Sequence, residues 1–123
     1  MLKFAVVLLL ALTVQAYALP PSGVDPDSPT SKWYQSLTVP GTGGSCCSLA
    51  DCRHYPISSA TDADGTSHYT VLFEGNWLPV PKEAVLDRLD NPTGDYVTCI
   101  NAAHFYDGVP KPDVLCLIKA PRT

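Results

Sequence analysis

The five cysteines are the residues of this chain best suited to chemistry. Cys46, Cys47 and Cys52 form an early group, and Cys99 and Cys116 follow much later. Cysteines form disulfides in exported proteins, bind metals as thiolates, or act as nucleophiles. The Cys-x-x-Cys pair typical of thioredoxin-like redox proteins is absent from the sequence. We therefore interpret all five as candidates for disulfides in a small exported domain.

Two disulfides would use four of these cysteines, and the sequence leaves their pairing open. We expect the early group to be tied to the strands that carry Cys99 and Cys116, which closes loops of about 50 to 70 residues. The competing arrangement joins Cys99 to Cys116 across neighbouring strands and closes the early group on itself. Three roles are open for the fifth cysteine: an unpaired buried residue with no chemical role, a disulfide link to a second chain, or a reactive thiol.

A thiol-redox or metal-binding site is the main alternative for the early group. Cys46, Cys47, Cys52 and His54 lie close together in the sequence, and Cys47, Cys52 and His54 would be the metal ligands. Structural zinc sites, however, usually contain two short cysteine pairs, and an oxidising compartment favours disulfides. A small hydrolase with a cysteine nucleophile and a histidine base is a further alternative. It depends only on the presence of these residue types, so we assign no catalytic residue, metal or cofactor.

Trp77 is the aromatic residue with the clearest alternative roles. It lies beside Pro79 and Pro81, and such a group can form a ledge that binds a ligand. Because a tryptophan buries a large area, we favour instead a core residue that anchors a hairpin. Any ligand surface is expected near Trp77, Tyr55 and Arg53.

The first 18 residues have the pattern of a cleavable signal peptide. Lys3 precedes an apolar run over residues 4–14, and the small-x-small sequence Ala16-Tyr17-Ala18 places the cut before Leu19. The run is shorter than the roughly 20 residues that span a bilayer. We therefore expect a secreted or periplasmic protein with no membrane span after cleavage.

The mature chain is predicted to contain a leader and one domain. Residues 19–31 are rich in proline and lack apolar periodicity, which predicts a disordered leader. Residues 32–123 are expected to form a single small domain stabilised by disulfides. At the boundary, Ser28 is placed to cap a helix that begins at Pro29, with Trp33 and Leu37 on its inner face.

Most of the domain is expected to form strands. Alternating residues predict a strand over 68–73, a turn at Gly75-Asn76 and an edge strand over 77–80. Further strands are expected to begin at Tyr55 and to cover residues 96–100 and 114–118, with a loop between the last two.

A second short helix is predicted to begin at Pro81, with Val85, Leu86 and Leu89 as its apolar stripe. The predicted fold class is therefore α+β and mostly β. It has a small antiparallel sheet of about four or five strands and one or two short helices, and it is stabilised by disulfides.

The charge of the chain excludes some partners. Its formal net charge is −4, with 12 acidic and 8 basic residues. Nucleic-acid binding usually needs a basic surface, and polybasic membrane attachment needs clustered Lys and Arg. We expect neither, and interpret the chain as a monomer or a disulfide-linked dimer.

Several short motifs together resemble a known group of proteins. They are Trp33-Tyr34-x-Ser36-Leu37, Cys46-Cys47-x4-Cys52-Arg53, Gly75-x-Trp77-x-Pro79-Val80-Pro81, Asn91-Pro92-Thr93-Gly94 and the late cysteine pair. Their order resembles an uncharacterised family of small exported, cysteine-containing proteins of alphaproteobacterial type, whose function is unknown. The resemblance covers Trp33 to Cys116 and implies a bacterial periplasmic or secreted setting, but no activity.

The sequence thus favours an exported, non-catalytic domain with a binding or structural role in the envelope. Core, turn and disulfide roles account for nearly all the notable residues, which leaves none to assign to catalysis. The expected partner is an unidentified protein or envelope component.

Overall fold

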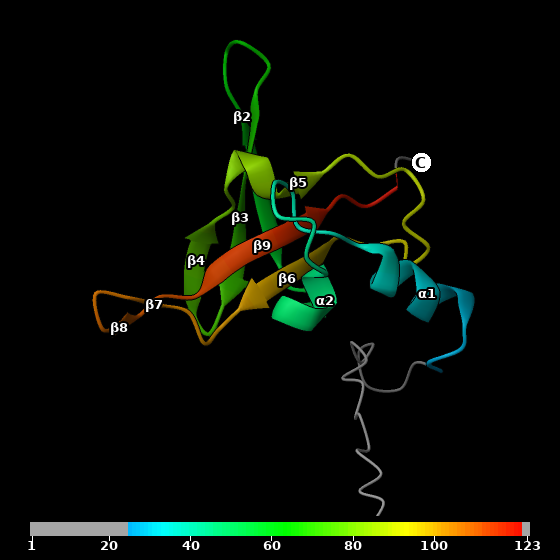
Figure 1. Ribbon diagram of the computed structural model, residues 1–123. Helices are drawn as coiled ribbons and strands as arrows, with labels where there is room; N and C mark the ends of the chain where they lie inside the picture. Colours follow the sequence, from blue (N-terminus) through cyan, green and yellow to red (C-terminus); the bar gives the residue numbers. More distant parts are fainter. Residues whose placement is uncertain (1–24, 122–123) are drawn as a thin grey trace, which may run out of the picture.

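The computed structural model describes residues 25–121 (Figure 1). The predicted signal peptide and the first part of the predicted leader lie outside the described residues. The helices are α1 (Pro29–Ser36), α2 (Cys46–Leu49) and the 3₁₀ helix η1 (Lys82–Ala84). The strands are β1 (Asp51–Arg53), β2 (Ile57–Thr61), β3 (Ser67–Phe73), β4 (Asn76–Pro79), β5 (Val85–Leu86), β6 (Val97–Asn101), β7 (Phe105–Tyr106), β8 (Val109–Pro110) and β9 (Asp113–Ile118).

The strands of residues 25–121 form three sheets. The central sheet has the order β1-β6-β9-β5, and its pairings are antiparallel except for the parallel pair β5–β9. A second sheet has the order β2-β3-β4, and β7 and β8 form a separate two-stranded hairpin. The mainly antiparallel sheets and the two short α-helices of residues 25–121 confirm the predicted fold class. None of the helices in residues 25–121 is long and apolar enough to cross a membrane.

Both faces of the central sheet are covered. On one face, α1 and α2 pack against inward side chains of β6 and β9; the buried members are Trp33, Tyr34, Leu37, Cys46, Cys52, Val97, Cys99, Cys116 and Ile118. On the other face, Ile100 and Val114 pack against Val71 of the second sheet. Residues 97–100 of β6 are consequently all buried, although alternate side chains of a strand point to opposite faces.

Helix α1 forms as its sequence predicts. Ser28 accepts a hydrogen bond at Oγ from the backbone N–H of Ser31 (3.1 Å), and Pro29 occupies the first helical position. Trp33 of the helix and Leu37 at its C-terminal end are both buried. The helix begins inside the segment that was predicted as a leader, and Ser31 is fully buried. The described end of that segment therefore belongs to the folded domain.

The predicted hairpin between β3 and β4 is present, but its turn lies one residue earlier. Phe73 pairs with Asn76, so Glu74 and Gly75 form the two-residue loop. Both have positive φ (47° and 80°), as a type I′ turn requires. Strand β4 is an edge strand, as the proline at position 79 predicted.

The prediction that a helix begins at Pro81 is wrong. Only the single 3₁₀ turn η1 forms, after which Val85 and Leu86 pair with Leu117 and Ile118 as β5. The edge of β9 is buried here, and its backbone groups need partners that a helix could not supply. Leu89, predicted to lie on the apolar stripe, is 96% exposed.

Two disulfides join the early and late parts of the chain. Cys46 is bonded to Cys116 over 70 residues, and Cys52 is bonded to Cys99 over 47 residues. The expected pairing of the early group with the two late strands is confirmed. In the chain-entropy model each bridge stabilises the fold by about 4 kcal/mol.

We predict that the double variant Cys46→Ala/Cys116→Ala has a free energy of unfolding about 4 kcal/mol lower than that of the natural chain, because a loop of 70 residues is no longer closed. Urea unfolding followed by circular dichroism measures the difference. The control is Cys47→Ser, which breaks no disulfide and should change the value by less than about 1 kcal/mol. Equal losses in both variants would contradict the prediction.

Candidate functional site

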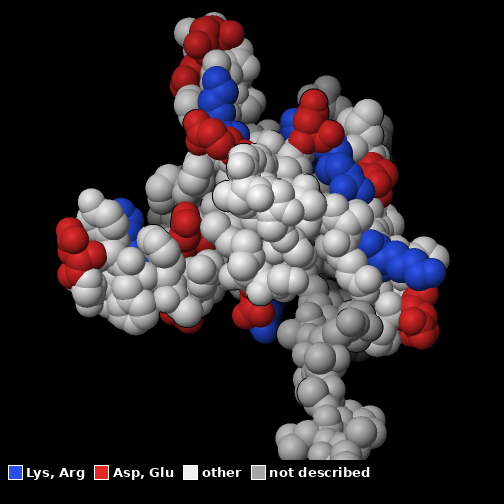
Figure 2. Space-filling view, viewed as in Figure 1, with Lys and Arg blue, Asp and Glu red and all other residues white. Residues whose placement is uncertain are grey.

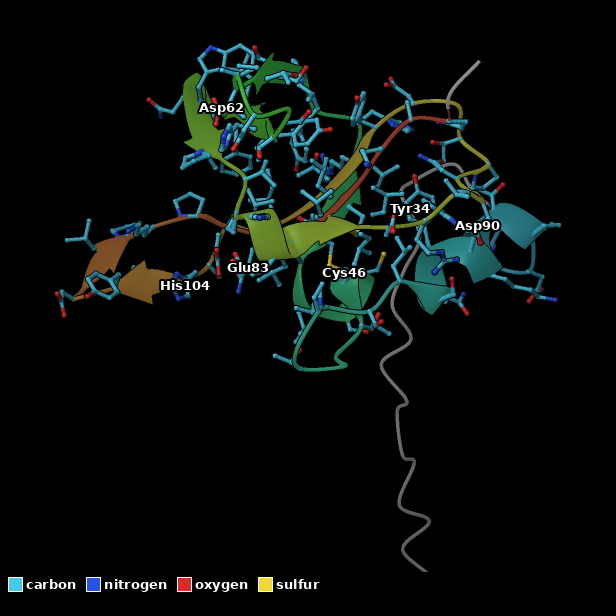
Figure 3. The ribbon with its side chains drawn as sticks, turned by 90° about the horizontal axis from the view of Figure 1, so that it is seen from above. Tyr34, Cys46, Asp62, Glu83, Asp90 and His104 are labelled. Atoms are coloured by element: carbon cyan, nitrogen blue, oxygen red, sulfur yellow. A yellow bond between two sulfur atoms is a disulfide. The ribbon has the colours of Figure 1, made fainter. Side chains whose placement is uncertain are left out.

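The sulfur atoms of the chain gather on the helix-covered face of the central sheet. Cys52, Cys99 and Cys116 are directly opposite one another on β1, β6 and β9. Cys46, at the start of α2, reaches this row through its bond to Cys116. Figure 3 shows Cys46 and its disulfide in the middle of the molecule. The register of three strands and one short helix thus brings all the bridged cysteines together.

Cys47 is the one free cysteine of the described chain, and it lies against a disulfide. Its half-buried Sγ is 3.0 Å from Cys52 Sγ and 3.4 Å from the carbonyl oxygen of Tyr34. The sulfur atoms of Cys47, Cys52 and Cys99 all lie within 4.8 Å of one another. A thiol is thereby held in contact with a bond that thiolates can attack.

The surroundings of Cys47 keep its thiol protonated. Burial raises the pKa of Cys47 to about 11. Burial also raises the pKa of Tyr34, and a negative charge on Cys47 adds to that effect. At pH 7 only roughly one Cys47 side chain in 10,000 is a thiolate. This free thiol is therefore much less reactive than an exposed cysteine.

The metal-ligand set predicted from the sequence is not assembled. His54 donates from Nδ1 to the carbonyl of Tyr96 (2.8 Å), and within residues 25–121 the residue grouped with Cys47 and Cys52 is Cys99. Because Cys52 and Cys99 are bonded to each other, only one thiol, Cys47, remains in the group. The hydrolase alternative finds no support either, since the hydrogen bonds of Cys47 go to Tyr34 and Cys52 rather than to a histidine.

The three residues of the predicted ligand surface lie on different faces and sheets. The side chain of Trp77 is 52% exposed, so its interpretation as a core residue is wrong. It pairs with Leu72, whereas the inward-facing neighbours Val71 and Leu78 pair with each other. Trp77 therefore lies on the outer face of the second sheet. Tyr55 packs edge-to-face on Phe73 on the inner face (5.8 Å between ring centroids), and Arg53 is exposed on β1 of the central sheet.

The sequence predicts a loop between the last two strands, but the structure has hairpin β7–β8 there, and this hairpin carries an exposed apolar tip. Phe105, Tyr106 and Val109 are 61%, 62% and 62% exposed. Asp107 and Gly108 have positive φ (50° and 75°) and form the two-residue turn. An Asp-Gly pair between short apolar runs is a strong local signal for such a turn, and it could have identified this hairpin.

The base of this hairpin is held by hydrogen bonds. Lys111 N donates to the carbonyl of His104 (2.8 Å), and His104 Nδ1 donates to the carbonyl of Lys111 (3.1 Å). Nζ of Lys111 lies 5.3 Å from the centroid of the Tyr106 ring. The hairpin directly follows β6 and directly precedes β9, and it projects from the body of the molecule (Figure 1). Figure 3 shows His104 on this projection.

The polar cluster beside α1 has a structural role. Arg88 donates from Nε and Nη2 to the two carboxylate oxygens of Asp90 (2.7 and 2.6 Å), and Trp33 Nε1 donates to the same carboxylate (3.2 Å). Arg88 also donates to Ser36 Oγ (3.1 Å). The hydrogen bond from Arg88, with a smaller contribution from Trp33, holds the pKa of Asp90 well below its usual range. These contacts fasten α1 to the segment that precedes β6.

The fold and the sulfur cluster define a small, mostly-β domain with two buried disulfides and one sheltered thiol. No protein-family model matches the chain, and no curated protein or solved structure matches it significantly.

We predict that iodoacetamide modifies Cys47 of the native protein slowly at neutral pH. Its rate should rise about tenfold for each pH unit between 7 and 10, because the thiolate fraction rises in that proportion below a pKa of about 11. Mass spectrometry of timed samples measures the rate. The denatured protein is the control, and its rate should level off above pH 9, near the ordinary pKa of cysteine. A native rate that levels off at the same pH would contradict the prediction.

Proposed function

We propose that this chain is an exported, non-catalytic domain that binds a partner protein through the tip of hairpin β7–β8. The observation that carries the proposal is the cluster of three exposed apolar side chains, Phe105, Tyr106 and Val109, on a projecting hairpin. Water-exposed apolar clusters are unfavourable unless a partner covers them, and aromatic residues are enriched in protein interfaces.

The pairing within the hairpin supports insertion into a cleft. Tyr106 pairs with Val109, and Phe105 pairs with Pro110, so adjacent pairs point to opposite faces of the hairpin. Each face therefore carries an apolar pair. A tip that is apolar on both faces buries more of its surface in a cleft than on a flat partner.

The charge of the chain favours a protein over a membrane as the partner. Asp107 lies in the turn, where it would be the first residue to meet an anionic lipid surface. The chain as a whole carries a formal charge of −4. In Figure 2 the charged side chains gather on the projections and the rim of the visible face. Lys111 beside the Tyr106 ring offsets the charge of Asp107 within the hairpin, so the repulsion of acidic headgroups comes from the net negative charge of the whole chain.

The export part of the proposal depends on the signal-peptide pattern and the disulfides. Both bridges are buried in the core, where their cysteines are at most 6% exposed. Bridges of this kind form and persist in oxidising compartments such as the bacterial periplasm or the extracellular medium. The proposed location is therefore secreted or periplasmic.

We predict that the protein recovered from the exported fraction begins at Leu19, because Ala16-Tyr17-Ala18 is a signal-peptidase site. After denaturation without a reducing agent, one thiol, Cys47, should react with N-ethylmaleimide. The intact mass measures both properties. An intact start at Met1 together with five reactive thiols would show that the chain is neither exported nor oxidised.

For the hairpin, we predict that a photo-crosslinking amino acid in place of Tyr106 gives one discrete protein adduct in cells that make the chain. The double change Phe105→Ser/Val109→Ser should reduce its yield at least about tenfold, because two apolar contacts are lost. Gel electrophoresis and mass spectrometry of the adduct measure the effect.

The matched control carries the same crosslinker at Ser59, an exposed position on the other projecting hairpin, β2–β3. Similar adducts from both positions would contradict a specific interface. Purified protein should not cosediment with phosphatidylglycerol vesicles. Cosedimentation would show that the tip binds a membrane and would contradict the proposed protein partner.

A further inference from the structure

The sulfur atoms of this chain are arranged for a rearrangement of its disulfides. The free thiol of Cys47 is 3.0 Å from one sulfur of the Cys52–Cys99 bridge, and Cys99 is directly opposite Cys116 of the other bridge. We propose that Cys47 starts an internal thiol–disulfide exchange that converts the observed pairing into a second pairing of the same five cysteines. This site is independent of the hairpin proposed as the binding surface.

In the first step, the Cys47 thiol loses its proton to water or hydroxide, and the thiolate attacks Cys52 Sγ. The new Cys47–Cys52 bond forms as the Cys52–Cys99 bond breaks, and the electron pair leaves with Cys99 as a thiolate. One disulfide is consumed and one is made. The step therefore requires no external oxidant or reductant.

In the second step, the released Cys99 thiolate attacks Cys116 Sγ across the β6–β9 pair. The Cys99–Cys116 bond forms, the Cys46–Cys116 bond breaks, and Cys46 leaves as a thiolate that takes up a proton. The cross-strand register places the two reacting residues opposite each other, so the step requires no change in strand pairing. The sum of both steps leaves two disulfides and one thiol.

The exchange changes which parts of the chain are covalently joined. In the observed pairing, both bridges connect α2 and β1 to β6 and β9. In the second pairing, one bridge lies within the segment 47–52 and the other joins β6 to β9. The N-terminal part through Arg53 is then held by packing and hydrogen bonds alone. The exchange therefore removes the covalent link that ties α1, α2 and β1 to β6 and β9.

The environment of Cys47 keeps the exchange slow in the resting protein. The titratable groups near it are Tyr34 of α1 and Asp51 of β1, which lines the same cavity as Cys47. Both are neutral or negative, so neither helps to form a thiolate. Because the rate of exchange follows the thiolate fraction, it should rise with pH or when a partner exposes Cys47.

The experiment follows the position of the free thiol in the oxidised full chain. The protein is incubated without added thiol at pH 7, 8, 9 and 10, quenched in acid, denatured and labelled with N-ethylmaleimide at about pH 5. Peptide mass spectrometry then identifies the labelled cysteine. Label is expected to move from Cys47 to Cys99 and Cys46, with an initial rate that rises about tenfold per pH unit. Label confined to Cys47 at every pH would overturn the proposal.

Two variants test the geometry. In Cys47→Ser/Ser48→Cys the single thiol moves to the exposed neighbouring position, and movement of the label should be at least tenfold slower. In Cys99→Ser, added oxidised glutathione should join Cys47 to Cys52, be reduced to two glutathione thiols in doing so, and leave no protein thiol to label. An unchanged rate in the first variant, or two labelled thiols in a folded second variant, would overturn the proposal.

Discussion

The covalent connection between α2–β1 and β6–β9 is the constraint on which the rest of the structure depends. Strand β1 has three residues and α2 has four, so neither could hold its place by its own hydrogen bonds. The two disulfides fix both elements on the central sheet, and α1 packs on the surface that they complete. The same row of sulfur atoms creates the contact between Cys47 and Cys52. Stability and sulfur chemistry thus arise from one alignment of three strands.

Much of this fold could be predicted where local signals and burial agree. The helix capped by Ser28, the alternation in β3 and the edge position of Pro79 are examples, because each depends on near neighbours in the sequence. The segment after Pro81 could not be predicted in this way, since its conformation is set by the unpaired edge of β9, more than 25 residues away. Local helix signals are weaker than the need to pair a buried edge.

The candidate sites show the same division. The pairing of early with late cysteines could be predicted, because the two groups were expected on different elements of the same small domain. The contact of Cys47 with Cys52 was not, since it depends on the orientation of a one-turn helix above the sheet. Trp77 was assigned to the core from its size, but the β3–β4 register places it outside. The loop predicted between the last two strands instead contains hairpin β7–β8, which has its turn at Asp107-Gly108 and exposes Phe105.

The position of hairpin β7–β8 also has a mechanical consequence. A partner that pulls on the tip loads β6 and β9, the two strands that continue from its base. Cys99 and Cys116 lie on these strands, and they are bonded to Cys52 of β1 and Cys46 of α2. Tension on the tip is therefore carried by covalent bonds after a few residues rather than by strand pairing alone. The domain can therefore act as a rigid anchor point, and force on the tip passes into the rest of the domain through the two disulfides at Cys99 and Cys116.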